Sequence, residues 1–137
     1  MKVLLVEDDQ DWRSRLEEAL REIPDMEIVG VGNETEAVRV LGEGGADLVL
    51  TDFWRGPADA RGSVKYWKVV CKAAESAGLS PDRGEIFVYS STPSYLGEAF
   101  DAGQNIISRD NLVIAARRAK EGGSGFIEAL GRVGVEG

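Results

Sequence analysis

The sequence predicts a single α/β domain: a doubly wound, five-stranded parallel sheet with helices on both faces. Short apolar runs alternate with amphipathic helical patterns over the whole chain. Parallel strands need crossover connections, and right-handed helical crossovers cover both faces of such a sheet. The length of 137 residues suits one domain with its own hydrophobic core.

Five short apolar runs predict the strands. They alternate along the chain with helical patterns, as in an open α/β sheet. The third run is continuous and apolar, as expected of a strand that is covered on both faces. We expect strands at residues 2–6, 27–31, 47–51, 86–89 and 105–108.

The first two helices are predicted by their ends and their apolar faces. The first is expected at about residues 11–22 and is ended by Pro24. Asn33 and Glu36 have the spacing of a capping box at the start of the second, which the segment 42–45 stops. The expected inner faces are Trp12, Leu16, Ala19, Leu20 and Ile23 in the first helix, and Ala37, Val38 and Leu41 in the second.

The later helices are separated by segments rich in glycine and proline. We expect loops at 55–62 and 78–84 and helices at about 63–77, from Pro93 to about 102, at 111–120 and at 126–133. The helix at 111–120 should turn its apolar residues inward: Leu112, Ala115, Ala116 and Ala119. Residues 122–137 are expected to be a glycine-rich break followed by a short helical tail.

Composition excludes several classes of function. The chain has no histidine, so it holds no Ser-His-Asp triad and no imidazole zinc site. A net charge of −8 argues against direct binding of nucleic acid. Cys71 is the one cysteine, which fits a reducing cytoplasm, and we expect it to be a small buried hydrophobe. No apolar stretch is long enough for a membrane span, and no signal peptide is recognisable.

Acidic residues gather where two predicted strands end. Glu7 and Asp8 follow the first strand, and Asp52 follows the third. Function in such sheets lies at the carboxyl ends of the strands, where Ser90 and Arg109 also fall. Carboxylates brought together repel one another unless a cation lies between them, so we expect a divalent metal and phosphate chemistry.

In these residues the chain resembles the receiver domains of two-component response regulators, over about residues 2 to 121. The acidic pair matches Glu7 and Asp8, and Asp52 lies 44 positions after Asp8, where the family has its phosphoacceptor. Ser90 matches the hydroxyl residue that contacts the phosphoryl group, with Ser91 or Thr92 in that role, or a turn-forming serine, as the alternatives. Arg109 stands where the family normally has lysine, and a surface salt-bridge residue is the competing interpretation of this arginine. The resemblance implies the flavodoxin-like strand order 2-1-3-4-5.

The segments Ile28-Val29-Gly30 and Arg109-Asp110 are similar to receivers of LuxR-type regulators. The resemblance implies a Mg²⁺ ion held directly by Asp8 and Asp52, by Glu7 through water and by the Trp54 carbonyl. It also implies a sensor histidine kinase or a phosphotransfer protein as donor and a downstream effector protein as partner. Only self-phosphorylation and self-dephosphorylation are expected as chemistry, and homodimer formation is left open.

The chain departs from the family at several places. The usual Met-Pro after the acceptor is absent, and Pro57 stands further along. Ile106 occupies the position of the aromatic switch residue. Arginine at 109 is not equivalent to lysine, because its planar group spreads its donors differently. These departures favour an alternative, a pseudo-receiver that binds partners without phosphorylation. A nucleotide or flavin binder has less support, since no phosphate-binding glycine loop follows the first strand.

Two further interpretations concern residues beside the expected site. Asp9 is expected to cap a helix rather than bind metal. The three tryptophans, Trp12, Trp54 and Trp67, are expected to be packing residues, and Trp54 has the alternative of shielding the acceptor from water.

Overall fold

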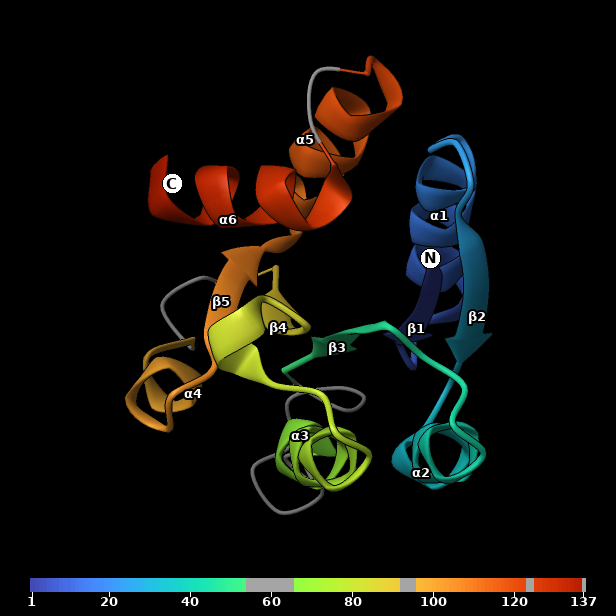
Figure 1. The fold of residues 1–137 in the computed structure, drawn as a ribbon, viewed down its shortest axis with the longest axis vertical. Helices are drawn as coiled ribbons and strands as arrows, with labels where there is room; N and C mark the ends of the chain where they lie inside the picture. The colour runs from blue at the N-terminus through green and yellow to red at the C-terminus, as the bar shows by residue number, and fades with distance from the viewer. Residues whose placement is uncertain (54–65, 92–95, 123–124, 137) are drawn as a thin grey trace.

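A computed structural model describes residues 1–53, 66–91, 96–122 and 125–136, and its strands form one parallel sheet in the order β2-β1-β3-β4-β5 (Figure 1). This is the order that the resemblance implies. All four strand pairings are parallel. The strands are β1 (Lys2–Val6), β2 (Glu27–Val31), β3 (Leu48–Asp52), β4 (Ile86–Ser90) and β5 (Asn105–Ser108).

Helices cover both faces of the sheet, as predicted. In Figure 1, α1, α5 and α6 lie above the sheet and α2 and α3 below it. A single 3₁₀ turn, η1 (Pro81–Arg83), interrupts the segment that was expected to be a loop at 78–84. The helices are α1 (Gln10–Arg21), α2 (Glu34–Gly42), α3 (Tyr66–Ser76), α4 (Gly97–Asp101), α5 (Arg109–Lys120) and α6 (Phe126–Glu136).

The strand bounds agree with the prediction to within one residue, and two differences bear on the site. β3 runs one residue further than expected, so Asp52 belongs to the strand itself. α5 begins two residues earlier, because the Ser108 side chain accepts a hydrogen bond from the Asn111 N–H and caps the helix. Arg109 is therefore the first residue of a helix at the edge of the sheet.

The sheet separates two hydrophobic cores. One core lies between the sheet and α1, α5 and α6, and includes Leu5, Leu16, Leu50, Leu112 and Leu130. The other lies between the sheet and α2, α3 and α4, and includes Leu4, Val49, Trp67, Val70 and Ala99. The alternation of neighbouring strand residues between the two cores is the period of two that a strand imposes.

Most of the predicted inner faces are confirmed, and one residue is wrong. Val38 is 40% exposed, and the buried face of α2 consists of Ala37, Val40 and Leu41. All four residues predicted to face inward from α5 are buried. Trp67 is buried as predicted and stacks on Phe53, the residue after Asp52, with ring centroids 5.6 Å apart. Burial also raises the pKa of the Cys71 thiol to about 12, which leaves it unreactive.

The C-terminal helix is longer than the one or two turns expected. α6 has 11 residues, and its buried residues join the same core as α1 and α5. The division of the chain into 1–121 and 122–137 stays a prediction. Within the described residues, no helix combines the length and the apolar character that crossing a membrane would require.

Candidate functional site

Three carboxylates meet at the carboxyl ends of β1 and β3. The pairing of Val6 with Thr51 brings the next residues, Glu7 and Asp52, to the same edge of the sheet. The Glu7 N–H continues the ladder by donating to the Val31 carbonyl at 3.0 Å. One carboxylate oxygen from each of Glu7, Asp8 and Asp52 lies within 4.8 Å of the others. We call these three residues the acid cluster.

Arg109 brings a positive charge to the acid cluster. Its Nη2 lies 3.1 Å from Glu7 Oε1 and 3.9 Å from Asp52 Oδ2. The residue is only 8% exposed, so this is a buried ion pair and not the surface salt bridge that the sequence left as a competing interpretation. Removing one partner of a buried ion pair leaves the other charge buried without compensation, which destabilises the folded state.

Sequence reasoning missed Tyr89, a further member of the site. Its hydroxyl donates to Glu7 Oε1 at 3.1 Å and also lies 3.3 Å from the Val6 carbonyl oxygen. Tyr89 pairs with Asp52 across β3 and β4, so both side chains leave the same face of the sheet. The sequence presents this tyrosine as one more apolar residue of a buried strand, and the signal that could have found it is its register with Asp52.

Of the two remaining predicted site residues, Ser90 is described by the structure and Trp54 is not. Ser90 is the last residue of β4, is buried, and pairs in register with Ser108, the residue before Arg109. It therefore lies at the predicted edge of the sheet, and its contact with a phosphoryl group stays a prediction. Trp54 lies outside the described residues, and so does the expected loop at 55–62.

Asp9 lies outside the acid cluster and caps α1, as predicted. Its side chain accepts hydrogen bonds from the backbone N–H groups of Asp11 and Trp12, at 3.0 and 3.1 Å. Its own N–H donates to Glu7 Oε2 at 3.1 Å. Asp9 therefore starts the helix and helps to fix the Glu7 carboxylate.

Replacing Asp9 with alanine should lower the free energy of unfolding by about 1 kcal/mol, the usual cost of losing an N-cap side chain. Urea unfolding measures the change. Asp11→Ala is the matched control, because Asp11 is an exposed residue of the first turn and is expected to contribute only a few tenths of a kcal/mol. Equal losses in the two variants would contradict a specific capping role.

Asp52 and Glu7 hold their protons more tightly than ordinary carboxylates, because the pKa of each is raised. Burial raises the pKa of Asp52 to about 8, with a further contribution from the neighbouring Glu7 charge, while Arg109 opposes the shift. Burial also raises the pKa of Glu7, against the lowering effects of the Asp9 N–H, Arg109 and the Tyr89 hydroxyl. Without a cation, the cluster keeps a proton near neutral pH.

The donor set suits a hard divalent cation. Magnesium and calcium take oxygen ligands, and three carboxylates beside one guanidinium leave negative charge to be balanced. Both oxygens of Glu7 already accept hydrogen bonds, from Arg109, Tyr89 and Asp9. Asp8 and Asp52 are therefore better placed than Glu7 to bind a metal directly. These residues fit a Mg²⁺ ion.

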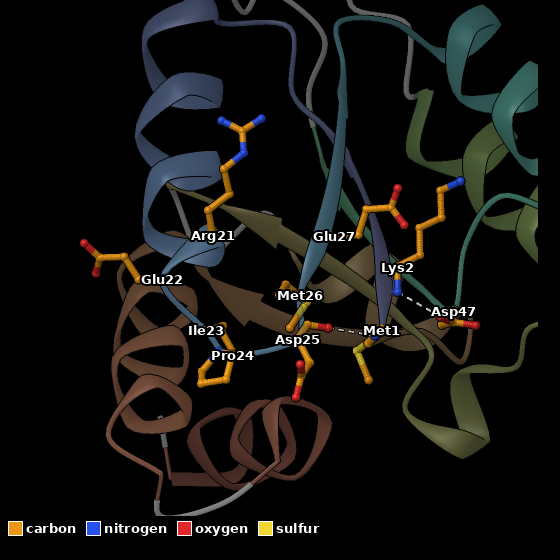
Figure 2. Close-up of a pocket in the computed structure, with 10 residues that line it drawn as sticks. All are labelled: Met1, Lys2, Arg21, Glu22, Ile23, Pro24, Asp25, Met26, Glu27 and Asp47. Carbon is orange, nitrogen blue, oxygen red and sulfur yellow. Dashed lines mark hydrogen bonds between the residues drawn. The ribbon is translucent and has the colours of Figure 1, made fainter.

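A separate cavity lies at the opposite end of the sheet, where the strands begin. It has a volume of about 540 Å³ and is lined from the start of β1, the end of α1 and the start of β2 (Figure 2). One lysine and one arginine share this lining with the carboxylates of Glu22, Asp25, Glu27 and Asp47. The Met1 amino group donates to the Asp25 carbonyl oxygen at 2.9 Å and the Lys2 N–H to Asp47 at 2.8 Å. Because positive and negative side chains share the lining, the cavity does not indicate one class of ligand.

The sequence matches no protein-family model and no curated protein. Solved structures with the same fold include the receiver domain of a modulated diguanylate cyclase from Desulfovibrio desulfuricans G20, with 19% identity, a TM-score of 0.64, and coverage of 99% of this chain and 98% of that one. A response regulator receiver protein from Sinorhizobium medicae WSM419 has 19% identity, a TM-score of 0.63, and coverage of 95% and 96%.

The isolated receiver domain of RcsB from Salmonella enterica serovar Typhimurium, studied with the phosphomimetic BeF3-, has 20% identity and a TM-score of 0.61, with coverage of 95% of this chain and 97% of that one. At such low identities a structural likeness establishes the fold, and the chemistry has to be argued from the site. The chain has the fold of the response regulator receiver domains.

Proposed function

We propose that this chain is a phosphoacceptor signalling domain in which Asp52 takes a phosphoryl group from a sensor histidine kinase, a phosphotransfer protein or a small phosphodonor, with Mg²⁺ as cofactor. The observation that carries the proposal is the acid cluster at the carboxyl ends of β1 and β3, with the Arg109 guanidinium 3.9 Å from Asp52. The receiver fold supports it, because such sheets place their sites at this edge.

The transfer is a displacement at phosphorus. An Asp52 carboxylate oxygen forms a bond to phosphorus while the P–N bond of a donor phosphohistidine breaks, and the donor imidazole leaves with the electron pair and takes up a proton. Bound Mg²⁺ would supply positive charge to the phosphoryl oxygens and to the acids that hold it. Asp8 and Asp52 are the proposed direct ligands, Glu7 the ligand through water and the Trp54 carbonyl a backbone ligand.

The other residues of the site orient the Glu7 carboxylate and balance the charge of the phosphoryl group. Arg109 faces Asp52 and would balance the charge of an aspartyl phosphate. Tyr89 and the Asp9 N–H fix the two oxygens of Glu7. Ser90 is proposed to donate its hydroxyl to a phosphoryl oxygen. The domain carries out no further reaction in this proposal, and its output is the control of a downstream effector protein in the cytoplasm.

Incubation with Mg²⁺ and acetyl phosphate tests the proposal by intact-mass spectrometry. The wild-type chain should gain the mass of one phosphoryl group, and the gain should disappear with EDTA and in Asp52→Asn. Asp9→Asn is the matched control, because it removes the same charge two residues from Glu7 but retains a capping side chain. It should be phosphorylated like the wild type. A mass gain that persists in Asp52→Asn would overturn the assignment of the acceptor.

The second candidate function is a pseudo-receiver that binds a partner protein without phosphorylation. The buried Arg109–Glu7 ion pair favours it, because the acids are partly neutralised by the chain's own guanidinium. In that case the wild type gains no mass with Mg²⁺ and acetyl phosphate, and Asp52→Asn binds the partner as tightly as the wild type does. Phosphorylation that changes partner affinity excludes this candidate.

A further inference from the structure

The side chain of Trp12 lies against Arg109, the cation of the site. The Arg109 Cζ is 4.3 Å from the centroid of the Trp12 ring, well within the range of a cation–π contact. Trp12 belongs to the first turns of α1 and Arg109 is the first residue of α5, two helices that cover the same face of the sheet (Figure 1). The site cation is therefore supported by a residue far away in sequence.

The guanidinium of Arg109 has one donor in use and an adjacent donor that is not. Nη2 donates to Glu7 Oε1, whereas Nε is buried and has no hydrogen-bond partner among the residues that the structure describes. The Nε–H group and the Nη2 amino group lie on one edge of the planar guanidinium. This edge binds carboxylates and phosphates through two parallel hydrogen bonds. A buried donor without a partner costs free energy, so its presence needs an explanation.

We propose that Trp12 is a positioning residue that holds this edge of Arg109 at the acid cluster, so that Nε and Nη2 together bind two oxygens of the phosphoryl group on Asp52. The inference rests on the proposed phosphoacceptor function. It gives the unpartnered Nε a ligand, and it gives the arginine at this position a task that a lysine ammonium does not perform in the same way.

The Trp12 ring restricts the movement of the Arg109 guanidinium. A free arginine side chain has many rotamers, and fixing them costs free energy each time a ligand binds. A flat aromatic face on one side of the guanidinium leaves its edges open and restricts its movement out of the plane. The contact is also protected, because Arg109 is only 8% exposed. Arg15 lies 5.3 Å from the same ring, which provides a control for charge near Trp12 that does not touch the acids.

Nitrogen-15 NMR of the metal-free protein tests the positioning directly. The Nε–H resonance of Arg109 is identified as the one that disappears in Arg109→Lys. In the wild type it should exchange slowly with water and show a ring-current shift. Trp12→Phe should retain slow exchange, and Trp12→Leu should lose it, while Arg15→Ala should change neither. Slow exchange that persists in Trp12→Leu would overturn the inference, whether or not the protein accepts phosphate.

Beryllofluoride binding in saturating Mg²⁺ tests the ligand. Loss of a desolvated cation–π contact corresponds to about a tenfold weaker beryllofluoride affinity for Trp12→Leu, with Trp12→Phe close to the wild type. In an Arg109→Lys background the same Trp12→Leu change should have no effect, because its target is gone. An equal loss in both backgrounds would show that Trp12 acts through general packing and would overturn the proposal.

The two tests separate the inference from the function on which it rests. If the wild type binds no beryllofluoride and gains no phosphoryl mass, the phosphoacceptor function fails, and the ligand proposed for Arg109 fails with it. If the wild type binds beryllofluoride but Trp12→Leu keeps both its affinity and the slow exchange of Arg109, the function stands and the role of Trp12 is wrong.

Discussion

Raising the pH from about 5 to about 8 is expected to destabilise the metal-free protein through Asp52. The pKa of this carboxyl is about 8 in the folded state, against an ordinary value of 3.8, so the folded protein holds a proton that the unfolded chain releases. The stabilisation is complete below the unfolded pKa and is lost as the pH rises through the folded pKa. The loss is on the order of 1 kcal/mol per pH unit within this window.

Urea unfolding at several pH values measures this effect, and Asp52→Asn isolates it. The variant has no proton to lose at this position, so its stability relative to the wild type should rise by about 3 kcal/mol between pH values of about 5 and 8. Carboxylates outside the acid cluster titrate alike in both proteins and cancel in the difference, which therefore reports Asp52 and its coupling to Glu7. Parallel curves for the two proteins would show that Asp52 has an ordinary pKa.

The same proton governs metal binding. A cation at the acid cluster needs ionised carboxylates, so Mg²⁺ must displace the proton that Asp52 holds. Stabilisation by Mg²⁺ should therefore be larger at a pH of about 8 than at about 6, as a shift in the urea midpoint at fixed Mg²⁺ concentration. Asp52→Asn should show a smaller shift at both pH values.

Replacing Arg109 with methionine should destabilise the metal-free protein by about 3 kcal/mol at a pH of about 8, because it leaves the Glu7 carboxylate buried without its cation. Methionine replaces the aliphatic stem of Arg109 with an apolar chain, so the loss reports the guanidinium, with its hydrogen bond to Glu7 and its contact with Trp12, more than the volume of the stem. Chemical denaturation measures it. At a pH of about 5 the loss should be smaller, since burial already favours the protonated form of Glu7.

A double-mutant cycle assigns this loss to the ion pair. Glu7→Gln removes the buried charge while leaving an oxygen that can accept from Tyr89 Oη. The double variant Glu7→Gln/Arg109→Met should therefore be more stable than the sum of the two single changes predicts. Arg109→Lys is the control that retains a positive charge. Additive losses would show that Glu7 and Arg109 do not depend on each other.

The sequence predicts the position of the acids well because strand ends are marked by local chemistry. Apolar runs that stop at Glu7 and Asp52 place both residues at the same edge of any parallel sheet built from them. Arg109 follows the last strand in the same way. The strand order itself was implied by the resemblance, since hydrophobic periodicity does not show which strands are neighbours.

What surrounds the acids depends on contacts that local patterns do not contain. Tyr89 belongs to the site because of its register with Asp52, and a shift of one residue would have turned it into the opposite core. Trp12 was expected to be a packing residue, but it stacks on Arg109, 97 positions further along the chain. Both roles follow from the way the elements pack on one another.

Two helices show how packing overrides a local pattern. In α2 the apolar residues allow more than one inner face, and the position of the sheet selects Val40 and leaves Val38 exposed. In α6 glycines at 131 and 134 weaken the helical signal, because glycine is a poor helix former. Its buried residues Phe126, Ala129, Leu130 and Val133 recur at helical spacing and are stabilised by the core they join.

The seating of α6 has a mechanical consequence. The four buried side chains of α6 share a core with Leu16 and Leu20 of α1 and with Leu112 of α5. Those two helices carry Trp12 and Arg109 at their first turns. A displacement of α6 would therefore disturb the core beneath the two helices whose first turns carry Trp12 and Arg109, so the last helix and the site cation depend on the same packing.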